Sequence, residues 1–453
     1  MELKDKRVLV VGLGKSGVAS ALFLKARGAR VTVSDTKSGD ELRNEIPALL
    51  DHGITVETGG HGERTFRGLD LIVVSPGVPV DAPLLQQARS LGEMVIGEIE
   101  LAAQFLPGPI VAITGSNGKT TTTTLTGEIL TAGGLPTLVG GNIGTPAITL
   151  AERAQPDTVI VLEVSSFQLE TIQTFHPKIA VVLNVTPDHL DRHRTFEAYA
   201  DAKARVFENQ QADDFAVLNA DDPTCVAMAA RTRAQVFWFS RQKEVKQGAW
   251  VRDGNILFRD GERQREIMLV SEIPLKGAHN LENVLAAVCA GALMGCAPEK
   301  IRQAVREFKA VEHRLEFVAT IRGVDYYNDS KATNVDATIK ALESFPANIH
   351  LILGGKDKGS DYSVLNDLLR QRVKSVYTIG AAAEKIESQI LSAKSGGVEV
   401  VHAETLENGL RKANAAAQPG DVVLLAPACA SFDQFKSYEH RGQVFKETVR
   451  RLT

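Results

Sequence analysis

The sequence predicts an α/β protein with about three domains, in which helices cover parallel sheets. Three observations support this fold class. The chain has 453 residues, and a single domain usually holds about 100 to 200. Residues 7–35 and 109–124 each combine an apolar strand, a glycine-rich turn and the start of a helix. After residue 311, apolar strands alternate with helical segments, which is typical of a doubly wound sheet.

The composition is that of a globular protein, with 44% hydrophobic residues and a formal net charge of -4. A weakly acidic chain is not expected to bind nucleic acid over its whole surface. Its four cysteines form no CxxC pair or dense framework, which indicates a reducing compartment. No export signal precedes the first strand, and the longest apolar run, 284–297, is shorter than the ~20 residues of a membrane span. We therefore expect a cytoplasmic protein without a membrane span.

The first motif, RVLVVGLGKSGVASALFLKARGARVTVSD, predicts a strand, a turn, a helix and a second strand. Gly12, Gly14 and Gly17 match GxGxxG, and Asp35 ends the second strand. In this Rossmann-like layout a phosphate lies over the helix N-terminus, and the acid holds a ribose or a base. A nicotinamide-dependent dehydrogenase and a turn without any ligand are both open interpretations. A further apolar strand, LDLIVV, ends at Ser75 and predicts more polar groups at the same sheet edge.

The second motif, AITGSNGKTTTTT at residues 112–124, predicts a phosphate-binding loop between a buried strand and a helix. Backbone amides beside the glycines and the helix N-terminus attract an anion. Lys119 would neutralise the outer phosphates of ATP, and Thr120 would bind magnesium. Only two residues separate Gly115 from Gly118, whereas the general P-loop has four. A glycine turn with a surface lysine is the alternative.

Polar residues follow further strands of the middle third. Asn142 lies in a glycine-rich loop, Glu163 ends the strand TVIVLE, and Asn184 and His189 follow the strand KIAVVL. A carboxylate at the top edge of the sheet can bind magnesium through oxygen, although an exposed glutamate and a structural histidine would look the same. From its helical pattern alone, Lys203 is expected to be an exposed lysine.

The segment after this helix changes character. Residues 236–270 lack helical periodicity and contain DG turns, which predicts an antiparallel appendage. The apolar segment that follows is predicted to be a helix with His279 and Asn280 at its start. Asn280 could contact a ligand there, or simply cap the helix.

The last third contains a predicted hairpin, EHRLEFVATIRGVDYYND, followed by four strands. Three loops exit strands of this sheet, at residues 328–334, 354–361 and 426–442, and the last is expected to open a helix at Ser431. Each loop alone would be an ordinary cap or turn. Three such loops at the same strand ends predict a site for anionic ligands.

Together these motifs resemble the Mur ligase family, the ATP-dependent amide-bond ligases of peptidoglycan precursor synthesis, to which folylpolyglutamate synthetase also belongs. TGSNGKTT at 114–121 is similar to the family's short phosphate loop, which accounts for the unusual spacing. GNIG, EVSSFQLE, NVTPDHLDRH, the helix with Lys203, HN at 279–280, HR at 313–314 and NDSKATN follow in the family's order. GLGKSG, Asp35-Thr36 and ACASFDQF are most similar to members that join D-glutamate to UDP-N-acetylmuramoyl-L-alanine. Tyr438 departs from the phenylalanine expected there.

The resemblance implies three domains: a Rossmann-like domain for the UDP-linked substrate at 1–93, a central P-loop-type ATPase domain at 94–310, and a Rossmann-like domain for the amino acid at 311–453. It implies a monomer that uses ATP and two Mg2+ ions. The alanyl carboxylate of UDP-N-acetylmuramoyl-L-alanine would attack the γ-phosphate of ATP, and the amine of D-glutamate would attack the resulting acyl phosphate. The alternatives are a folylpolyglutamate synthetase-like ligase, an NAD-dependent dehydrogenase and a non-catalytic binding protein.

The resemblance also implies roles for single residues. Those expected to bind ATP are Gly115, Ser116, Asn117, Gly118, Lys119, Thr120, Thr121, Asn280, Arg314 and Asp329. Those expected to bind the UDP-linked substrate are Gly14, Ser16, Asp35, Thr36, Ser75, Asn142, Gln168 and His189. Those expected near D-glutamate and the transferred phosphate are Lys331, Thr333, Lys358, Ser431, Phe432 and Tyr438. The expected magnesium ligands are Thr120, Glu163, His189 and Lys203, the last as a carbamate. The expected catalytic residues are Lys119, His189, Lys203 and Lys358.

Overall fold

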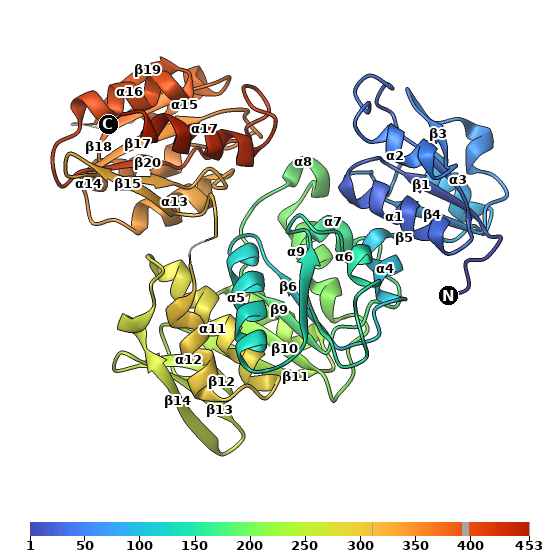
Figure 1. The fold of residues 1–453 in the computed structure, drawn as a ribbon. Coiled ribbons are helices and arrows are strands. Elements are labelled where there is room, and N and C mark those ends of the chain that lie inside the picture. Colours follow the sequence, from blue (N-terminus) through green and yellow to red (C-terminus); the bar gives the residue numbers. More distant parts are fainter. Residues whose placement is uncertain (310, 392–397, 453) are drawn as a thin grey trace. The chain divides into compact units, whose positions relative to one another are not determined.

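The computed structural model describes residues 1–309, 311–391 and 398–452. Strands in these residues form three sheets, of five, nine and six strands (Figure 1). The chain divides into two compact units, Met1–Glu272 with Glu282–Arg306, and Ile273–Leu281 with Glu307–Thr453. The predicted α/β class with three parallel-rich sheets is confirmed. The predicted domain limits stay predictions, and those at residues 310 and 453 lie outside the described residues.

The first sheet has the strand order β3-β2-β1-β4-β5, and all of its strands are parallel. Strands β1 and β4 are buried along nearly their whole length, as expected of strands covered on both faces. The elements of this sheet are β1 Arg7–Val11, α1 Lys15–Ala26, β2 Arg30–Ser34, α2 Ile46–Asp51, β3 Thr55–Glu57, η1 Glu63–Phe66, β4 Leu71–Val74, α3 Pro83–Ser90, β5 Val95–Gly97 and α4 Glu98–Ala103. The predicted strand, turn, helix and strand over residues 7–35 are confirmed.

The second sheet has the order β14-β13-β12-β11-β10-β9-β6-β8-β7. Its strands are β6 Ile110–Thr114, β7 Thr137–Gly141, β8 Val159–Glu163, β9 Ile179–Val182, β10 Phe215–Asn219, β11 Gln235–Ser240, β12 Gly248–Arg252, β13 Asn255–Asp260 and β14 Arg263–Leu269. Its helices are α5 Lys119–Ala132, α6 Ala147–Leu150, α7 Ser166–Leu169, α8 Leu190–His193, α9 Phe196–Ala204, η2 Arg205–Phe207, α10 Pro223–Met228, η3 Ala229–Arg231, η4 Val270–Glu272, α11 Ala278–Leu293 and α12 Pro298–Glu307.

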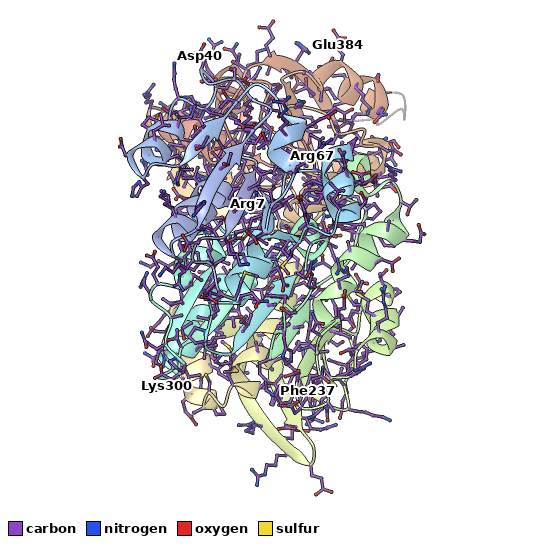
Figure 2. All side chains as sticks on the ribbon, turned by 90° about the vertical axis from the view of Figure 1, so that its right-hand side faces the viewer. Arg7, Asp40, Arg67, Phe237, Lys300 and Glu384 are labelled. Atoms are coloured by element: carbon purple, nitrogen blue, oxygen red, sulfur yellow. The ribbon has the colours of Figure 1, made fainter. Side chains whose placement is uncertain are left out.

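The predicted antiparallel appendage over residues 236–270 is only partly correct. Strands β11 and β12 continue the parallel sheet, and antiparallel pairing occurs only where β13 pairs with β12 and with β14. Phe237 belongs to β11 (Figure 2), and the apolar run around it suits a strand buried between parallel neighbours. Gly248 permits the close pairing of β12 with β11, because a Cβ there would lie 1.8 Å from the carbonyl oxygen of Trp238.

The third sheet has the order β15-β16-β20-β17-β18-β19. Only β15 is antiparallel to its neighbour, and Arg322 and Gly323 form the predicted hairpin turn with left-handed φ angles of 50° and 80°. The last helix begins at Tyr438 after the N-cap Ser437, so the predicted start at Ser431 is wrong. The elements are β15 Glu316–Ile321, β16 Val324–Asn328, α13 Val335–Glu343, β17 Ile349–Gly354, η5 Ser363–Leu365, α14 Asn366–Arg372, β18 Val373–Ile379, α15 Ala383–Leu391, β19 Glu399–Glu404, α16 Leu406–Ala416, β20 Val422–Leu425 and α17 Tyr438–Arg450.

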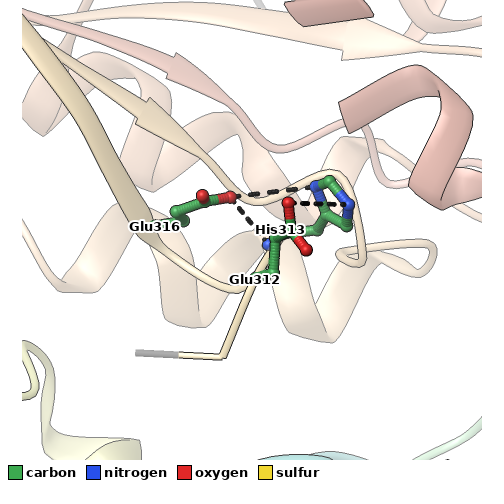
Figure 3. A group of neighbouring side chains, drawn as sticks. All are labelled: Glu312, His313 and Glu316. Atoms are coloured by element: carbon green, nitrogen blue, oxygen red, sulfur yellow. Dashed lines mark hydrogen bonds and ion pairs between the residues drawn. The ribbon is translucent and has the colours of Figure 1, made fainter. Parts of the chain in front are cut away.

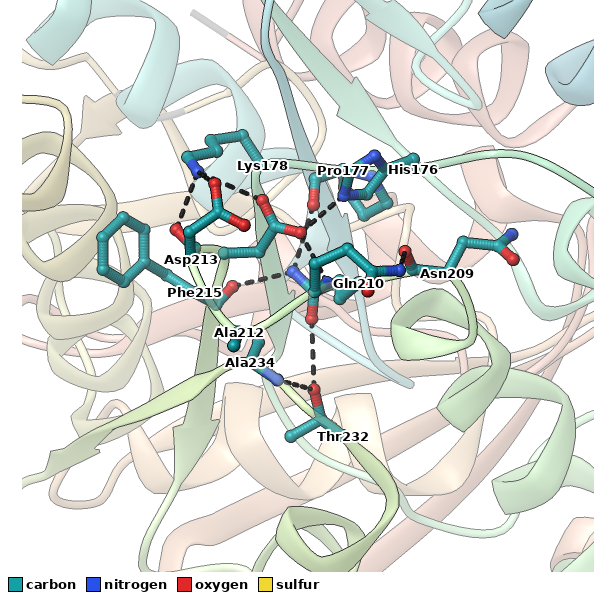
Figure 4. Close-up of polar contacts among 12 residues, drawn as sticks. His176, Pro177, Lys178, Asn209, Gln210, Ala212, Asp213, Phe215, Thr232 and Ala234 are labelled. Carbon is teal, nitrogen blue, oxygen red and sulfur yellow. Dashed lines mark hydrogen bonds and ion pairs between the residues drawn. The ribbon is translucent and has the colours of Figure 1, made fainter.

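A polar network fixes the amino ends of β9 and β10 (Figure 4). The buried carboxylate of Asp214 accepts hydrogen bonds from His176 and from the backbone N–H of Gln211, and it pairs with Lys178. The side-chain amide of Gln210 donates to the carbonyl oxygens of Pro177 and Phe215. Since β9 and β10 are parallel, their carboxyl ends meet at the opposite edge, where the predicted polar loops lie.

One apolar core runs through the first unit and includes side chains from β1 and from β6, such as Val8 and Ala112. Burial of each large aliphatic side chain in such a core stabilises the fold by about 1.5–3 kcal/mol. Among the residues that the structure describes, no helix has the length and apolar character needed to cross a membrane.

Candidate active site

The phosphate-loop candidate joins β6 to α5 and is held by asparagines from neighbouring elements. The backbone N–H of Asn117 donates to the Asn184 side chain at 2.9 Å, and the Asn184 amide donates back to the Asn117 carbonyl at 3.1 Å. Gly118 has a φ of 87°, and a Cβ there would lie 2.1 Å from Oδ1 of Asn283 on α11. The loop conformation therefore requires glycine at this position and is fixed by Asn184.

Two lysines share a carbonyl oxygen of this loop. Lys119 Nζ donates to the carbonyl oxygens of Gly115 and Ser116, at 2.9 and 2.7 Å. Lys203 Nζ donates to the same Gly115 oxygen at 2.8 Å. Burial, and then the charge of Lys119, lower the pKa of Lys203 well below its usual value. The site therefore favours the neutral amine of Lys203 more than water does.

Lys203 is 1% exposed, so the expectation of an exposed lysine is wrong. Its helix, α9, buries nearly all of its second half rather than a single stripe. The ammonium position lies 4.5 Å from the centre of the Tyr199 ring, and the Tyr199 hydroxyl lies 3.1 Å from Oγ of Ser116. The helix thus places both Tyr199 and Lys203 against the phosphate loop.

The strand-end acid Glu163 lies beside this loop, as predicted. Its carboxylate is 1% exposed, accepts from the Thr120 hydroxyl at 2.7 Å and accepts from the Asn142 amide at 2.9 Å. Glu163, Thr120 and Asn142 therefore meet at one edge of the central sheet. A buried carboxylate beside a hydroxyl and an amide is the type of oxygen-rich set that suits magnesium.

His189 lies in a left-handed conformation, with a φ of 54°, at the start of α8. Its ring packs edge-on against Phe167 at a centroid distance of 4.9 Å and lies 6.5 Å from the Tyr199 ring. The His189 side chain is 37% exposed. The ring is therefore held by aromatic neighbours while part of it stays accessible.

Gln168 has a structural role that we did not assign from the sequence, although Ser165 and Gln168 have the spacing of a capping box. Its side chain is buried and accepts from the backbone N–H of Ser165, while the Ser165 hydroxyl caps the N–H of Gln168. This capping box fixes the first turn of α7. The predicted contact of Gln168 with substrate stays a prediction.

The first glycine turn is organised by the residues predicted to bind the UDP-linked substrate. Asp35 accepts from the backbone N–H of Leu13 at 2.6 Å and from that of Lys37 at 2.8 Å. The Ser75 hydroxyl donates to the carbonyl oxygen of Gly12 at 2.7 Å. Ser16 is partly buried, while Gly14 and Thr36 are exposed at this edge of the first sheet. The structure therefore brings these predicted residues together.

In the second unit, the buried acid Asp329 lies near two predicted site residues, Arg314 from the ATP set and Lys331 from the D-glutamate set. Asp329 is 7% exposed, and burial raises its pKa to about 6, against the opposing charges of Arg314 and Lys331. Lys331 Nζ lies 5.0 Å from the centre of the Tyr438 ring. The Asn280 amide donates to the carbonyl oxygen of Lys276. Asn280 lies inside α11, two residues after the first residue Ala278, so it does not occupy the N-cap position.

The residues predicted near D-glutamate lie on adjoining loops of the third sheet. Lys356 and Ala430 form an antiparallel bridge that joins the loop with Lys358 to the segment with Ser431. Ser431 is buried, whereas Lys358 and Phe432 are exposed and Thr333 is intermediate. The phenol of Tyr438 belongs to the first turn of α17.

A group of possible metal ligands that the sequence did not indicate comprises Glu312, His313 and Glu316 (Figure 3). Lys446 contacts both carboxylates. The Asn328 amide lies 2.9 Å from Nδ1 of His313. Because the Lys446 ammonium pairs with both carboxylates, we interpret the group as a salt-bridge cluster that fixes the start of β15.

Comparisons with known proteins cover the whole chain. The Mur ligase MurD-like N-terminal domain matches residues 6–97, the Mur ligase middle domain 113–291, and the Mur ligase glutamate ligase domain 313–429. The curated UDP-N-acetylmuramoylalanine--D-glutamate ligase of Koribacter versatilis is 69% identical over 452 residues, which cover 100% of this chain and 99% of the relative. The chain belongs to the Mur ligase family.

A second relative of this Mur ligase agrees. The UDP-N-acetylmuramoylalanine--D-glutamate ligase of Acidobacterium capsulatum is 61% identical over 451 residues, covering 99% of this chain and 97% of the relative. The solved structure of the MurF ligase from Thermotoga maritima in complex with ADP has a TM-score of 0.61 and 17% identity, with 100% of both chains covered. At that identity the structure shows a shared fold. As a member of this family, the protein is an ATP-dependent ligase, and the dehydrogenase interpretation of GxGxxG is dropped.

Some residues that shape the site of this Mur ligase were not assigned a role from the sequence. Asn184 was recognised only as a residue that follows a strand, and Tyr199 and Asn283 were assigned no role. Asn184 had a usable signal, since it follows a buried strand as Glu163 ends one. Asn283 had none, because its position beside Gly118 depends on how α11 packs.

Proposed function

We propose that this Mur ligase joins D-glutamate to UDP-N-acetylmuramoyl-L-alanine and converts ATP to ADP and phosphate. The observation that carries the proposal is the 69% identity, over the full chain, with a relative named for that activity. The loop between β6 and α5, with its two lysines and buried acid, supports the phosphate chemistry.

The proposed reaction brings a carboxylate close to the γ-phosphate of ATP, so several negative charges must be held together. In our proposal the amides of the 115–118 loop and the N-terminus of α5 bind the phosphates, and Lys119 turns from the loop carbonyls to the outer phosphates. A cation and backbone amides held in a site partly shielded from water stabilise such charge better than water does. Attack by the substrate carboxylate then yields an acyl phosphate, which the amine of D-glutamate attacks with loss of phosphate.

The donor set around Glu163 fits magnesium, because it offers a buried carboxylate and the Thr120 hydroxyl beside the loop. We propose that Glu163, Thr120 and His189 hold magnesium, and that bound magnesium would offset phosphate charge. Lys203 completes the set only if its amine is modified. A neutral amine can add carbon dioxide and release a proton to become a carbamate with oxygen ligands, and the lowered pKa of Lys203 favours the neutral amine.

We assign the other two substrates to the other two sheets. In our proposal Asp35, Thr36 and Ser75 hold the uridine end of the UDP-linked substrate, and Asn142 and Gln168 contact its muramoyl part. Lys358 and Ser431 receive D-glutamate, whose carboxylates suit a lysine and a buried hydroxyl. Asn280, Arg314 and Asp329 act on the nucleoside side of ATP. Each assignment follows the family resemblance and the position of the residue at a sheet edge.

Omission assays of phosphate release test the proposed function. Purified protein receives ATP, magnesium, UDP-N-acetylmuramoyl-L-alanine and D-glutamate, and each component is left out in turn. We expect rapid release only in the complete mixture, with a product whose mass equals the substrate plus one glutamate minus water. Release with a folate substrate in place of the UDP-linked one, or with L-glutamate at the same rate, would contradict the proposal.

A further inference from the structure

The loop with Lys358 is joined to the segment with Ser431 by backbone pairing. Lys356 N–H donates to the Ala430 carbonyl at 2.8 Å, and Ala430 N–H donates to the Lys356 carbonyl at 3.1 Å. A Cβ at Gly355 would lie 2.3 Å from the carbonyl oxygen of Ala430, so the two backbone segments lie too close together for a side chain at residue 355. This pairing ends before Lys358 and leaves the rest of the loop to be held by side chains.

A hydrogen-bonded row of three side chains, Asp357, Tyr362 and Cys429, holds the part of the loop that contains Lys358. The Tyr362 hydroxyl donates to Asp357 Oδ1 at 2.8 Å and lies 3.0 Å from Sγ of Cys429. Tyr362 and Cys429 are 0% and 1% exposed. Because the only hydroxyl hydrogen of Tyr362 is directed at Asp357, the thiol of Cys429 must donate to the phenol oxygen. Burial raises the pKa of Cys429 to about 11, which keeps this thiol protonated.

Asp357 receives further donors from both sides. Its Oδ2 accepts from Lys385 Nζ at 2.7 Å, and its Oδ1 accepts from the backbone N–H of Ser360 at 3.2 Å. Although burial acts in the opposite direction, these bonds lower the pKa of Asp357, so it is a carboxylate. The Asp357 carboxylate thus fixes the turn over residues 357–360, which contains Lys358. Through Tyr362 it is linked to Cys429, in the loop that follows β20.

We propose that Tyr362 is a positioning residue for the amino-acid subsite. Through its hydroxyl it fixes Asp357, and with it the backbone of Lys358, against the segment from Cys429 to Ser431. The inference rests on the proposed function, because it takes Lys358 and Ser431 as the groups that receive D-glutamate. Tyr362 itself touches no substrate in this proposal.

The test compares Tyr362→Phe with Tyr326→Phe in the full-length enzyme. Tyr326 is also 0% exposed, lies on β16 of the same sheet and donates its hydroxyl to Asn414 at 2.6 Å. Both variants lose one buried hydroxyl, so similar losses of melting temperature are expected. We expect Tyr362→Phe to raise KM for D-glutamate about fivefold to tenfold, with kcat and the KM values of ATP and the UDP-linked substrate within about twofold. Tyr326→Phe should leave all three KM values within about twofold.

A second pair of variants tests whether the Cys429 thiol donates its hydrogen bond to the Tyr362 oxygen. Cys429→Ser keeps a donor for the phenol oxygen, whereas Cys429→Ala removes it. KM for D-glutamate should therefore rise less in Cys429→Ser than in Cys429→Ala. An unchanged KM for D-glutamate in Tyr362→Phe, or equal changes of all three KM values, would overturn the positioning role while wild-type ligation still supports the proposed function. Absence of D-glutamate-dependent ligation in the wild type would instead overturn the proposed function.

Discussion

Two motifs of the chain, β1 with α1 and β6 with α5, each place a glycine-containing turn between a buried strand and a helix, but the side chains around the two turns differ. The turn between β1 and α1 is closed by a carboxylate and a hydroxyl, since Asp35 accepts from Leu13 N–H and Ser75 donates to Gly12. The turn between β6 and α5 is instead contacted by two lysines, Lys119 and Lys203. A glycine turn therefore specifies where a ligand approaches the sheet, and the side chains around it specify the charge of that ligand.

This difference fits the two substrates that we assign. Asp35 has acceptor capacity beyond the two amides it binds, which suits an N–H donor of a base. The second turn offers the partly buried ammonium of Lys119, which suits the phosphates of ATP. The comparison also explains why GxGxxG alone did not identify a nicotinamide cofactor, because the motif describes only the backbone.

The largest effect should come from removing the cation of the second turn. We expect Lys119→Ala to fold normally and to lose about 100-fold or more of its turnover, since a charge that stabilises the transferred phosphate is gone. Lys15→Ala is the matched control, because Lys15 also begins a helix after a glycine turn but is exposed. Its kcat/KM should change less than about threefold, since solvent screens its charge. If Lys119→Ala keeps more than about a tenth of wild-type turnover, the phosphate role is wrong.

Lys203 makes the difference between the two turns clearer. It donates to the Gly115 carbonyl of the second turn, and among the described residues no buried lysine from another helix contacts the first turn in this way. We expect Lys203→Ala to lose on the order of 100-fold of activity, because a buried ligand group is removed. A short-chain carboxylic acid should restore part of the activity by occupying the position of the carbamate. Wild-type activity of Lys203→Ala without any additive would refute the carbamate.

Ser431 extends the comparison to the third sheet, where we assign the amino acid. We expect Ser431→Ala to raise KM for D-glutamate about tenfold and to leave KM for ATP unchanged, since one buried hydrogen-bonding group is lost. Ser437→Ala is the control, because Ser437 caps α17 through His440 N–H and should cost about 1 kcal/mol of stability without changing either KM. Equal changes of both KM values in Ser431→Ala would remove Ser431 from the subsite.

The smallest effect concerns the helix α4, after which the chain enters the second motif. Burial raises the pKa of Glu98 to about 7 from 4.5, so the folded state prefers the protonated acid. Between about pH 4.5 and pH 7 the unfolded chain loses the Glu98 proton while the folded protein keeps it, so the free energy of unfolding of the wild type should fall as pH rises through this range. Glu98→Gln lacks this pH dependence and keeps an acceptor for Ile148 N–H. Its melting temperature relative to the wild type should increase by a few degrees between pH 5 and pH 8.

Glu100, two residues further along α4, is the control with the opposite sign. Hydrogen bonds from Gln173, Thr174 and Phe175 lower its pKa although burial opposes them. Glu100→Gln should therefore lose most stability above the usual pKa of 4.5 and less as pH falls below it. Parallel pH profiles for the two variants would contradict the assignment of both shifts.

Apolar runs and turn residues were enough to predict the strands, the glycine turns and the acid that ends β8. The strands before Gly12 and Gly115, the hairpin turn at Arg322 and the acid at Glu163 all follow from apolar runs and turn residues. The errors occurred where packing decides. The burial of Lys203, the parallel pairing of β11 with β12 and the late start of α17 each depend on contacts between segments distant in sequence or on a cap beyond the pattern. The Tyr362 row is of the same kind, because Asp357 and Cys429 are far apart in the chain.

The division of charge between the two turns is tested most directly by nucleotide binding to two variants. Calorimetric titrations with ADP in the presence of magnesium, and with UDP, would be made on the wild type, Lys119→Ala and Asp35→Asn. We predict that Lys119→Ala weakens ADP binding about tenfold or more and leaves UDP within about twofold, while Asp35→Asn does the reverse. If either variant weakens both nucleotides equally, or if Lys119→Ala weakens UDP more than ADP, the two turns do not divide the substrates as proposed.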